Sequence, residues 1–117
     1  MAENREYLTQ IEENGSINIS EEVVASVAVD AMKEIEGVGA MGQNMTEQFT
    51  GRKSVRGVHA ELQDGGILVD IYLMVRYGYA IPEVAKKVQD CVGSALGGMT
   101  GFPVKSVNVH VAGISFN

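Results

Sequence analysis

Two stretches of the chain repeat one order of patterns: a short alternating run, a helical stripe that opens at Ile-Ser or Ile-Pro, a turn with glycine, and another alternating run. The first stretch is GSINISEEVVASVAVDAMKEIEGVGAM followed by GVHAEL. The second stretch runs from Tyr77 to Phe116. Right-handed crossovers place both helices on the same face of one sheet. The pattern predicts an α+β fold, a two-layer sandwich in the order strand, helix, strand, strand, helix, strand with a mainly antiparallel sheet.

An antiparallel hairpin is expected in the middle of the chain. Apolar residues alternate with polar ones from Val58 to Leu62, and a longer alternation follows the Asp64-Gly65-Gly66 turn from Ile67 to Val75. Two alternating runs around a glycine-containing turn are typical of a hairpin. The odd-numbered residues of the longer strand are expected to face the helices. The opposite face then collects His59, Glu61, Leu68, Asp70, Tyr72, Met74, Arg76, Asn108 and His110.

Both helices carry terminal signals and an apolar stripe. Ser20 is a good N-cap for the first helix, and Gly37 is expected to end it. Pro82 suits the first turn of the second helix, and Gly97-Gly98 is expected to stop it. The first stripe consists of Val24, Val27, Ala28, Ala31 and Ile35. The second consists of Val84, Val88, Cys91, Val92, Ala95, Leu96 and Met99.

Cys91 is the single cysteine, so it can form no internal disulfide. Its place on the second stripe predicts a buried thiol that behaves as a small hydrophobe, without nucleophilic chemistry.

The length of 117 residues fits one domain, which we assign to residues 15–117. Residues 1–14 carry five charged and few core-sized side chains, which predicts a flexible tail or a frayed helix. No charged-then-apolar leader opens the chain, which favours the cytoplasm. The longest apolar run is interrupted by Asp70 and is too short to span a bilayer, so membrane association would be peripheral or through a partner.

The sequence shows no familiar catalytic or cofactor motif. It has no G-x-S-x-G, no H-E-x-x-H, no P-loop and no G-x-G-x-x-G after a strand, so we expect neither an enzyme nor a cofactor. Two histidines share the open face with Glu61 and Asp70, and these are ordinary zinc ligands. No close-spaced ligand pair accompanies them, which favours solvated or interface histidines over a metal site.

The open face is the first candidate for partner binding. Large apolar side chains grouped on one sheet face usually mark a partner surface. We expect Tyr72 to be exposed there, so that Tyr72→Ala would weaken self-association or partner capture and leave the fold intact. The partner-binding residues predicted on this face are Leu68, Asp70, Tyr72, Met74 and Arg76.

The polar segment from Met41 to Gly57 is the second candidate. It is longer than ordinary connections and is expected to be mobile. Its basic residues Arg52, Lys53 and Arg56 could bind an anionic partner, or they could simply keep a long loop soluble. An RNA- or phosphometabolite-binding domain that uses them is the alternative function, although the net charge of −6 disfavours nucleic acid as the main partner.

With these residues laid out, the chain resembles the alkaline shock protein family of Gram-positive bacteria, also called envelope stress response proteins, over about residues 15–116. The resemblance rests on Gly15 to Ser20 with Glu22-Val23-Val24, Glu36-Gly37-Val38, Gly57-Val58-His59, Val75 to Gly78, Ile81 to Ala85, Val88-Gln89, Met99-Thr100-Gly101, and Val107 to Val111 with Gly113 and Phe116.

The resemblance implies a non-enzymatic cytoplasmic protein. From the residues themselves we expect an interaction module that binds partner proteins and itself through the open sheet face and the basic loop. In some members of the family a membrane-anchoring partner holds the protein at the membrane, and the family is involved in cell-envelope stress. Other members are suspected regulators of acetyl-CoA carboxylase in fatty-acid synthesis. The residues of this chain do not decide between the two branches.

Overall fold

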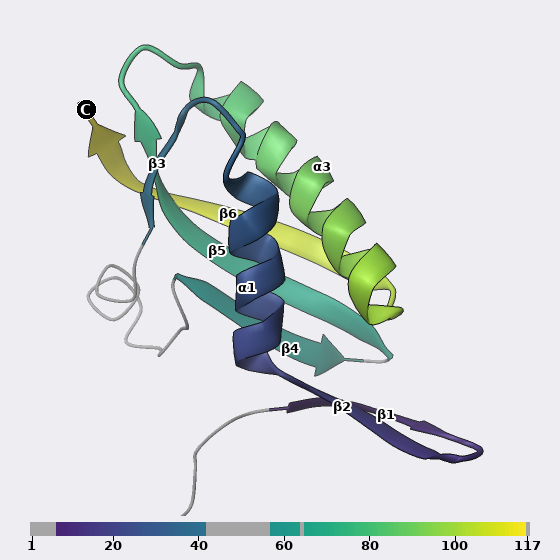
Figure 1. Cartoon of the computed structure of the whole chain (residues 1–117). Helices are drawn as coiled ribbons and strands as arrows, with labels where there is room; N and C mark the ends of the chain where they lie inside the picture. Colours follow the sequence, from purple (N-terminus) through teal and green to yellow (C-terminus); the bar gives the residue numbers. More distant parts are fainter. Residues whose placement is uncertain (1–6, 42–56, 64, 117) are drawn as a thin grey trace, which may run out of the picture.

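The long alternating run of the sequence forms the central strand of a four-stranded sheet (Figure 1). A computed structural model of the chain describes residues 7–41, 57–63 and 65–116. Its elements in chain order are β1 (Tyr7–Glu12), β2 (Gly15–Ser20), α1 (Glu21–Met32), β3 (Val38–Met41), β4 (Val58–Gln63), β5 (Gly66–Arg76), α3 (Ile81–Thr100) and β6 (Val104–Ser115).

Strand β5 has neighbours on both sides. The predicted hairpin is confirmed: β4 pairs antiparallel with β5 from Val58 opposite Ile71 to Gln63 opposite Gly66. Strand β3 pairs antiparallel with the later part of β5. Strand β6 pairs parallel with β5 along nearly its whole length. Both helices cover one face of this sheet, as Figure 1 shows. The α+β sandwich with a mainly antiparallel sheet is therefore confirmed.

The predicted alternation of β5 is also confirmed. Ile67, Val69, Ile71, Leu73 and Val75 all have fully buried side chains. They belong to one core cluster with the buried residues of α1 and α3. The even-numbered residues consequently point to the opposite face, because successive side chains of a strand alternate.

The first predicted strand forms, but it does not join the main sheet. Strand β2 pairs antiparallel with β1, from Tyr7 opposite Ser20 to Glu12 opposite Gly15, in a separate two-stranded sheet. This hairpin extends away from the two layers (Figure 1). Residues 7–12 are thus a strand where the sequence indicated none, while residues 1–6 lie outside the described part. The flexibility of residues 1–14 stays a prediction.

Helix α1 begins as predicted and ends earlier. Ser20 is its N-cap, and its Oγ accepts a hydrogen bond from the Val23 N–H at 3.2 Å. The last helical residue is Met32, since the Lys33 N–H turns back to the Asp30 carbonyl at 3.2 Å. Gly37 therefore serves a later turn with a φ of +97°, where an added Cβ would lie 2.8 Å from Val84 Cγ2.

Helix α3 has Pro82 in its first turn, as predicted, but it does not stop at Gly97-Gly98. It continues to Thr100 and ends at Gly101, whose φ of +78° is left-handed and whose N–H donates to the Gly97 carbonyl. A glycine pair in a helix interior costs about 1 kcal/mol per residue, which packing can override. The helix-ending role belongs to the glycine that adopts a positive φ.

Cys91 is exposed, so the prediction of a buried thiol is wrong. The buried residues of α3 are Val84, Val88, Val92 and Leu96. They repeat every four residues, so the buried stripe is narrower than the sequence predicted. Cys91, the residue before Val92, lies outside this stripe. Met99, also placed on the stripe, is 71% exposed.

We expect Cys91 in the folded protein to react with a thiol reagent about as fast as a cysteine in a short peptide. Cys91→Ser should change the free energy of unfolding by less than about 0.5 kcal/mol, as is usual for surface substitutions. Labelling kinetics with and without urea measure the first expectation. A thiol that reacts only after unfolding would contradict the exposed position.

Within the described residues, no helix combines the length and the apolar character needed to span a bilayer.

Candidate functional site

Asp70 lies at the centre of a polar network on the sheet face opposite the helices. Its Oδ1 accepts a hydrogen bond from Asn108 Nδ2 at 3.3 Å and lies 3.1 Å from His110 Nε2. The strand register explains the contacts, because Asp70 lies opposite Asn108 on β6 and Tyr72 lies opposite His110. The sequence predicted these four residues on one face, and the structure brings them together.

Tyr72 is buried, with 2% of its surface exposed, so the prediction of an exposed tyrosine is wrong. Its ring stacks on the His110 ring with a centroid distance of 4.5 Å and an interplanar angle of 13°. Its backbone N–H donates to the Gly57 carbonyl at 2.8 Å. The stack on His110 covers one face of the ring, and position on the face opposite the helices therefore does not make this tyrosine exposed.

The other predicted face residues keep some exposure. Leu68, Asp70 and Met74 are half-buried and Arg76 is exposed. Arg52, Lys53 and Arg56, together with most of the predicted loop, lie outside the described residues.

His59 lies at the edge of the sheet, beside the start of α1. Glu21 Oε2 accepts a hydrogen bond from the Ala60 N–H at 3.0 Å. The same oxygen lies 3.1 Å from His59 Nδ1, in a direction too bent for a hydrogen bond, and His59 Nε2 lies 3.4 Å from Glu61 Oε2. The sequence assigned Glu21 only to the helix dipole. In the structure it also satisfies a backbone donor of the edge strand β4.

These two groups of polar residues do not make a metal centre in the part of the chain that the structure describes, where no set of three or more His, Cys, Asp or Glu side chains is arranged to hold an ion.

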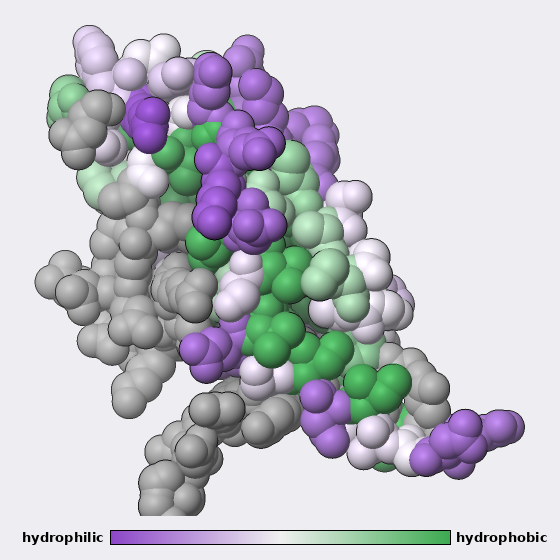
Figure 2. Space-filling view, viewed as in Figure 1, coloured by the Kyte–Doolittle hydropathy of each residue, from purple (hydrophilic) through white to green (hydrophobic). Residues whose placement is uncertain are grey.

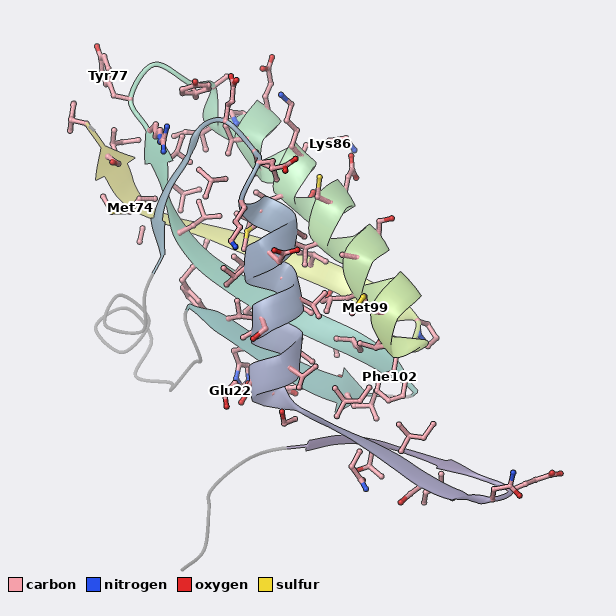
Figure 3. The ribbon with its side chains drawn as sticks, in the orientation of Figure 1. Glu22, Met74, Tyr77, Lys86, Met99 and Phe102 are labelled. Carbon is pink, nitrogen blue, oxygen red and sulfur yellow. The ribbon has the colours of Figure 1, made fainter. Side chains whose placement is uncertain are left out.

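A cluster of exposed apolar side chains forms where β5 and β6 end and α3 begins. The rings of Tyr77 and Phe116 stack with a centroid distance of 5.2 Å and are 72% and 77% exposed. Tyr79 and Ile81 follow Tyr77 in the chain and are also exposed. Figure 3 shows Tyr77 pointing away from the body of the protein. We call these four residues the aromatic end.

The aromatic end was not predicted from the sequence. Tyr77 and Phe116 are far apart in the chain, and the pairing of β5 with β6 brings them together, with the Tyr77 N–H donating to the Ser115 carbonyl at 2.7 Å. The local sequence of each segment gives no signal for this contact, because it depends on the pairing of two distant strands.

A second apolar area lies between the two helices. Figure 2 shows hydrophobic residues gathered over this part of the surface. A groove of about 250 Å³ separates α1 from α3 there and is lined by Val27, Ala31, Ala95 and Met99 among others.

The chain is similar to proteins of one family over most of its length. Residues 9–116 match the model of a family whose name is the letters Asp followed by the number 23, and which is described as having a cell envelope-related function. The chain belongs to this cell envelope-related family. The letters and the number are a family name and denote no residue of this chain.

Relatives within the family occur in Gram-positive bacteria. The uncharacterized protein YqhY of Bacillus subtilis is 35% identical over 107 residues, which cover 88% of this chain and 79% of YqhY. The uncharacterized protein YloU of the same organism is 35% identical over 106 residues, which cover 86% of this chain and 88% of YloU.

The uncharacterized protein Spy1614 of Streptococcus pyogenes is 33% identical over 107 residues, which cover 86% of this chain and 88% of Spy1614. No solved structure is significantly similar to the chain. Membership of the family implies a cell envelope-related function for this chain.

Proposed function

We propose that this protein is a non-catalytic module that binds a partner protein of the cell envelope, and that the aromatic end is its principal contact surface. The protein acts from the cytoplasm and reaches the membrane through that partner. The role in alkaline or envelope stress implied by the resemblance belongs to the same proposal.

The exposed Tyr77–Phe116 stack is the observation that supports this function. Burying a large aromatic side chain stabilises a contact by about 1.5–3 kcal/mol, and an exposed pair forgoes that gain until a partner covers it. Tyrosine and phenylalanine are enriched in protein interfaces, where few residues supply most of the binding energy. Because the two rings already stack, little side-chain entropy remains to be lost on binding.

The exposed part of the sheet face stays in the proposal as a second contact area. Leu68 and Met74 supply half-buried apolar surface, while Asp70 and Arg76 supply charges that can orient a partner. Tyr72 lies on the same face, between Asp70 and Met74 along β5, and stacks on His110. We also propose that the protein self-associates.

The double variant Tyr77→Ser/Phe116→Ser tests the function. Purified tagged protein would be mixed with membrane and soluble fractions of a Gram-positive bacterium that carries the family, and captured proteins would be quantified by mass spectrometry. We expect the double variant to retain at least about tenfold less of the principal partner, because two anchoring side chains are lost. Its melting temperature should stay close to that of the wild type, since both side chains are exposed.

Met99→Ser is the matched control. Met99 is apolar and about as exposed as Tyr77 and Phe116, but it lies near the end of α3, whereas only the start of α3 belongs to the aromatic end. Equal capture by the wild type and the double variant would contradict the proposal. Loss of capture in the control alone would move the contact to the helix layer.

A further inference from the structure

Strand β6 has an outer edge that pairs with no other strand among the described residues. It pairs with β5 on one side, while β3 and β4 occupy the other side of β5. Proteins usually protect such edges with lysines, prolines or bulges, because an open edge is a template for another strand. The start of the edge is protected by Pro103 and Lys105, and the register shifts once between Val104 and Ser106 and again after Val111. Between these shifts, from Ser106 to Val111, the edge contains neither proline nor a charged Lys, Arg, Asp or Glu.

One backbone group of this edge already accepts a hydrogen bond from a side-chain amide. Gln89 Nε2 of α3 donates to the Val107 carbonyl at 3.1 Å. Alternate residues of a strand point their backbone groups to the same side, so those of Val109 and Val111 also point outward. The Gln89 amide therefore occupies the place that an N–H of an added strand would take.

A groove of about 750 Å³ lies between the first part of this edge and the later turns of α3, which are close together in Figure 1 and diverge toward the end of β6. Its helical wall is low because Gly93 and Gly97, one turn apart, carry no side chain. Its remaining lining mixes polar and apolar groups: Gln89, Phe102, Pro103, Val104, Ser106, Val107 and Asn108, with Gly101 at the end of the helix.

The packing of the chain itself does not require these two glycines. An added Cβ at Gly93 would lie 3.8 Å from Val107 Cγ2, and one at Gly97 would lie 3.9 Å from Val104 Cγ2, which are ordinary contact distances. Each glycine in a helix interior costs about 1 kcal/mol relative to alanine. Helix α3 is therefore less stable than it would be with alanine at these two positions. The missing side chains leave open space beside β6.

We propose that this groove binds an extended segment of another protein, which adds as a strand to β6 and places small side chains against Gly93 and Gly97. Strand addition between an open edge and a helix is an established mode of peptide recognition, in which the backbone supplies affinity and the pockets select alternate side chains. The net charge of −6 attracts a segment with basic flanking residues. The site is separate from the aromatic end and does not depend on it.

Selection from a displayed library of random peptides about twelve residues long tests the site. We expect the selected peptides to be extended, with small residues at alternate positions and basic residues at their ends. On binding they should slow the hydrogen exchange of the Val109 and Val111 amides. They should bind Gly97→Leu at least about tenfold more weakly, a loss of about 1.4 kcal/mol, because the new side chain fills the groove.

Gly98→Leu is the control, since it makes the same change at the next residue, where an added Cβ meets nothing within 4 Å. If Gly97→Leu does not fold, Gly97→Ala replaces it, and this variant should melt at a higher temperature while binding more weakly. Gln89→Ala should strengthen peptide binding, because it leaves the Val107 carbonyl to the added strand.

Failure to select any peptide would overturn the proposal, as would peptides that bind Gly97→Leu and wild type equally. A wild-type dimer in sedimentation that Gly97→Leu dissociates, with no peptide selected, would assign the edge to a second copy of the chain instead.

Discussion

Tyr72→Ala is expected to lower the free energy of unfolding by about 3–5 kcal/mol, the usual cost of removing a buried aromatic ring. Tyr72 is 2% exposed and its ring stacks on His110, so truncation leaves a cavity and removes the support of that imidazole. Urea denaturation followed by circular dichroism measures the loss.

Tyr72→Phe separates the ring from its hydroxyl group. This variant keeps the stack, so we expect it to lose no more than about 1.5 kcal/mol, the upper value for one hydrogen bond. An alanine variant as stable as the wild type but impaired in association would restore the interface role that the sequence alone suggested for Tyr72.

Ile71→Ala is expected to cost about 2–5 kcal/mol, the range for large aliphatic side chains truncated in a core. Ile71 is fully buried among the residues shared by the sheet and both helices. The same urea experiment measures it. Ile17→Ala is the control, because Ile17 lies exposed on the β1–β2 hairpin and its truncation removes little packing. Similar losses in the two variants would contradict the assignment of the core.

The sequence predicted what depends on local pattern. The alternation from Ile67 to Val75 indicated which residues of β5 are buried, because the period of a strand is two residues. Ser20 and Pro82 marked the starts of both helices, because capping chemistry acts within one turn. The face shared by Asp70, Asn108 and His110 followed from the same alternation.

What the sequence did not predict depends on contacts between distant segments. The burial of Tyr72 requires the pairing with β6 that brings His110 against it. Cys91 was predicted to be buried because it belongs to an apolar stripe. The stripe alone does not determine how much of the helix surface packs against the sheet. The short strand β3 lacks a clear alternation, and it forms because the edge of β5 beyond β4 is open to it.

The aromatic end shows the same limit in the candidate site. Neither Tyr77 nor Phe116 is distinctive in its own segment, and only the parallel pairing of β5 with β6 brings the two rings within 5.2 Å. Apolar residues at strand ends are common in sequences. Their stacking and exposure together single out this pair.

Photo-crosslinking in living cells can show whether the aromatic end contacts a protein of the cell envelope, with a photoreactive amino acid at position 77 of the full chain. Lys87, exposed on α3, gives the control position. We expect a discrete adduct with another protein from position 77, recovered with the cell envelope, and only background from position 87. Background alone at position 77, in a folded variant expressed at the wild-type level, would contradict it.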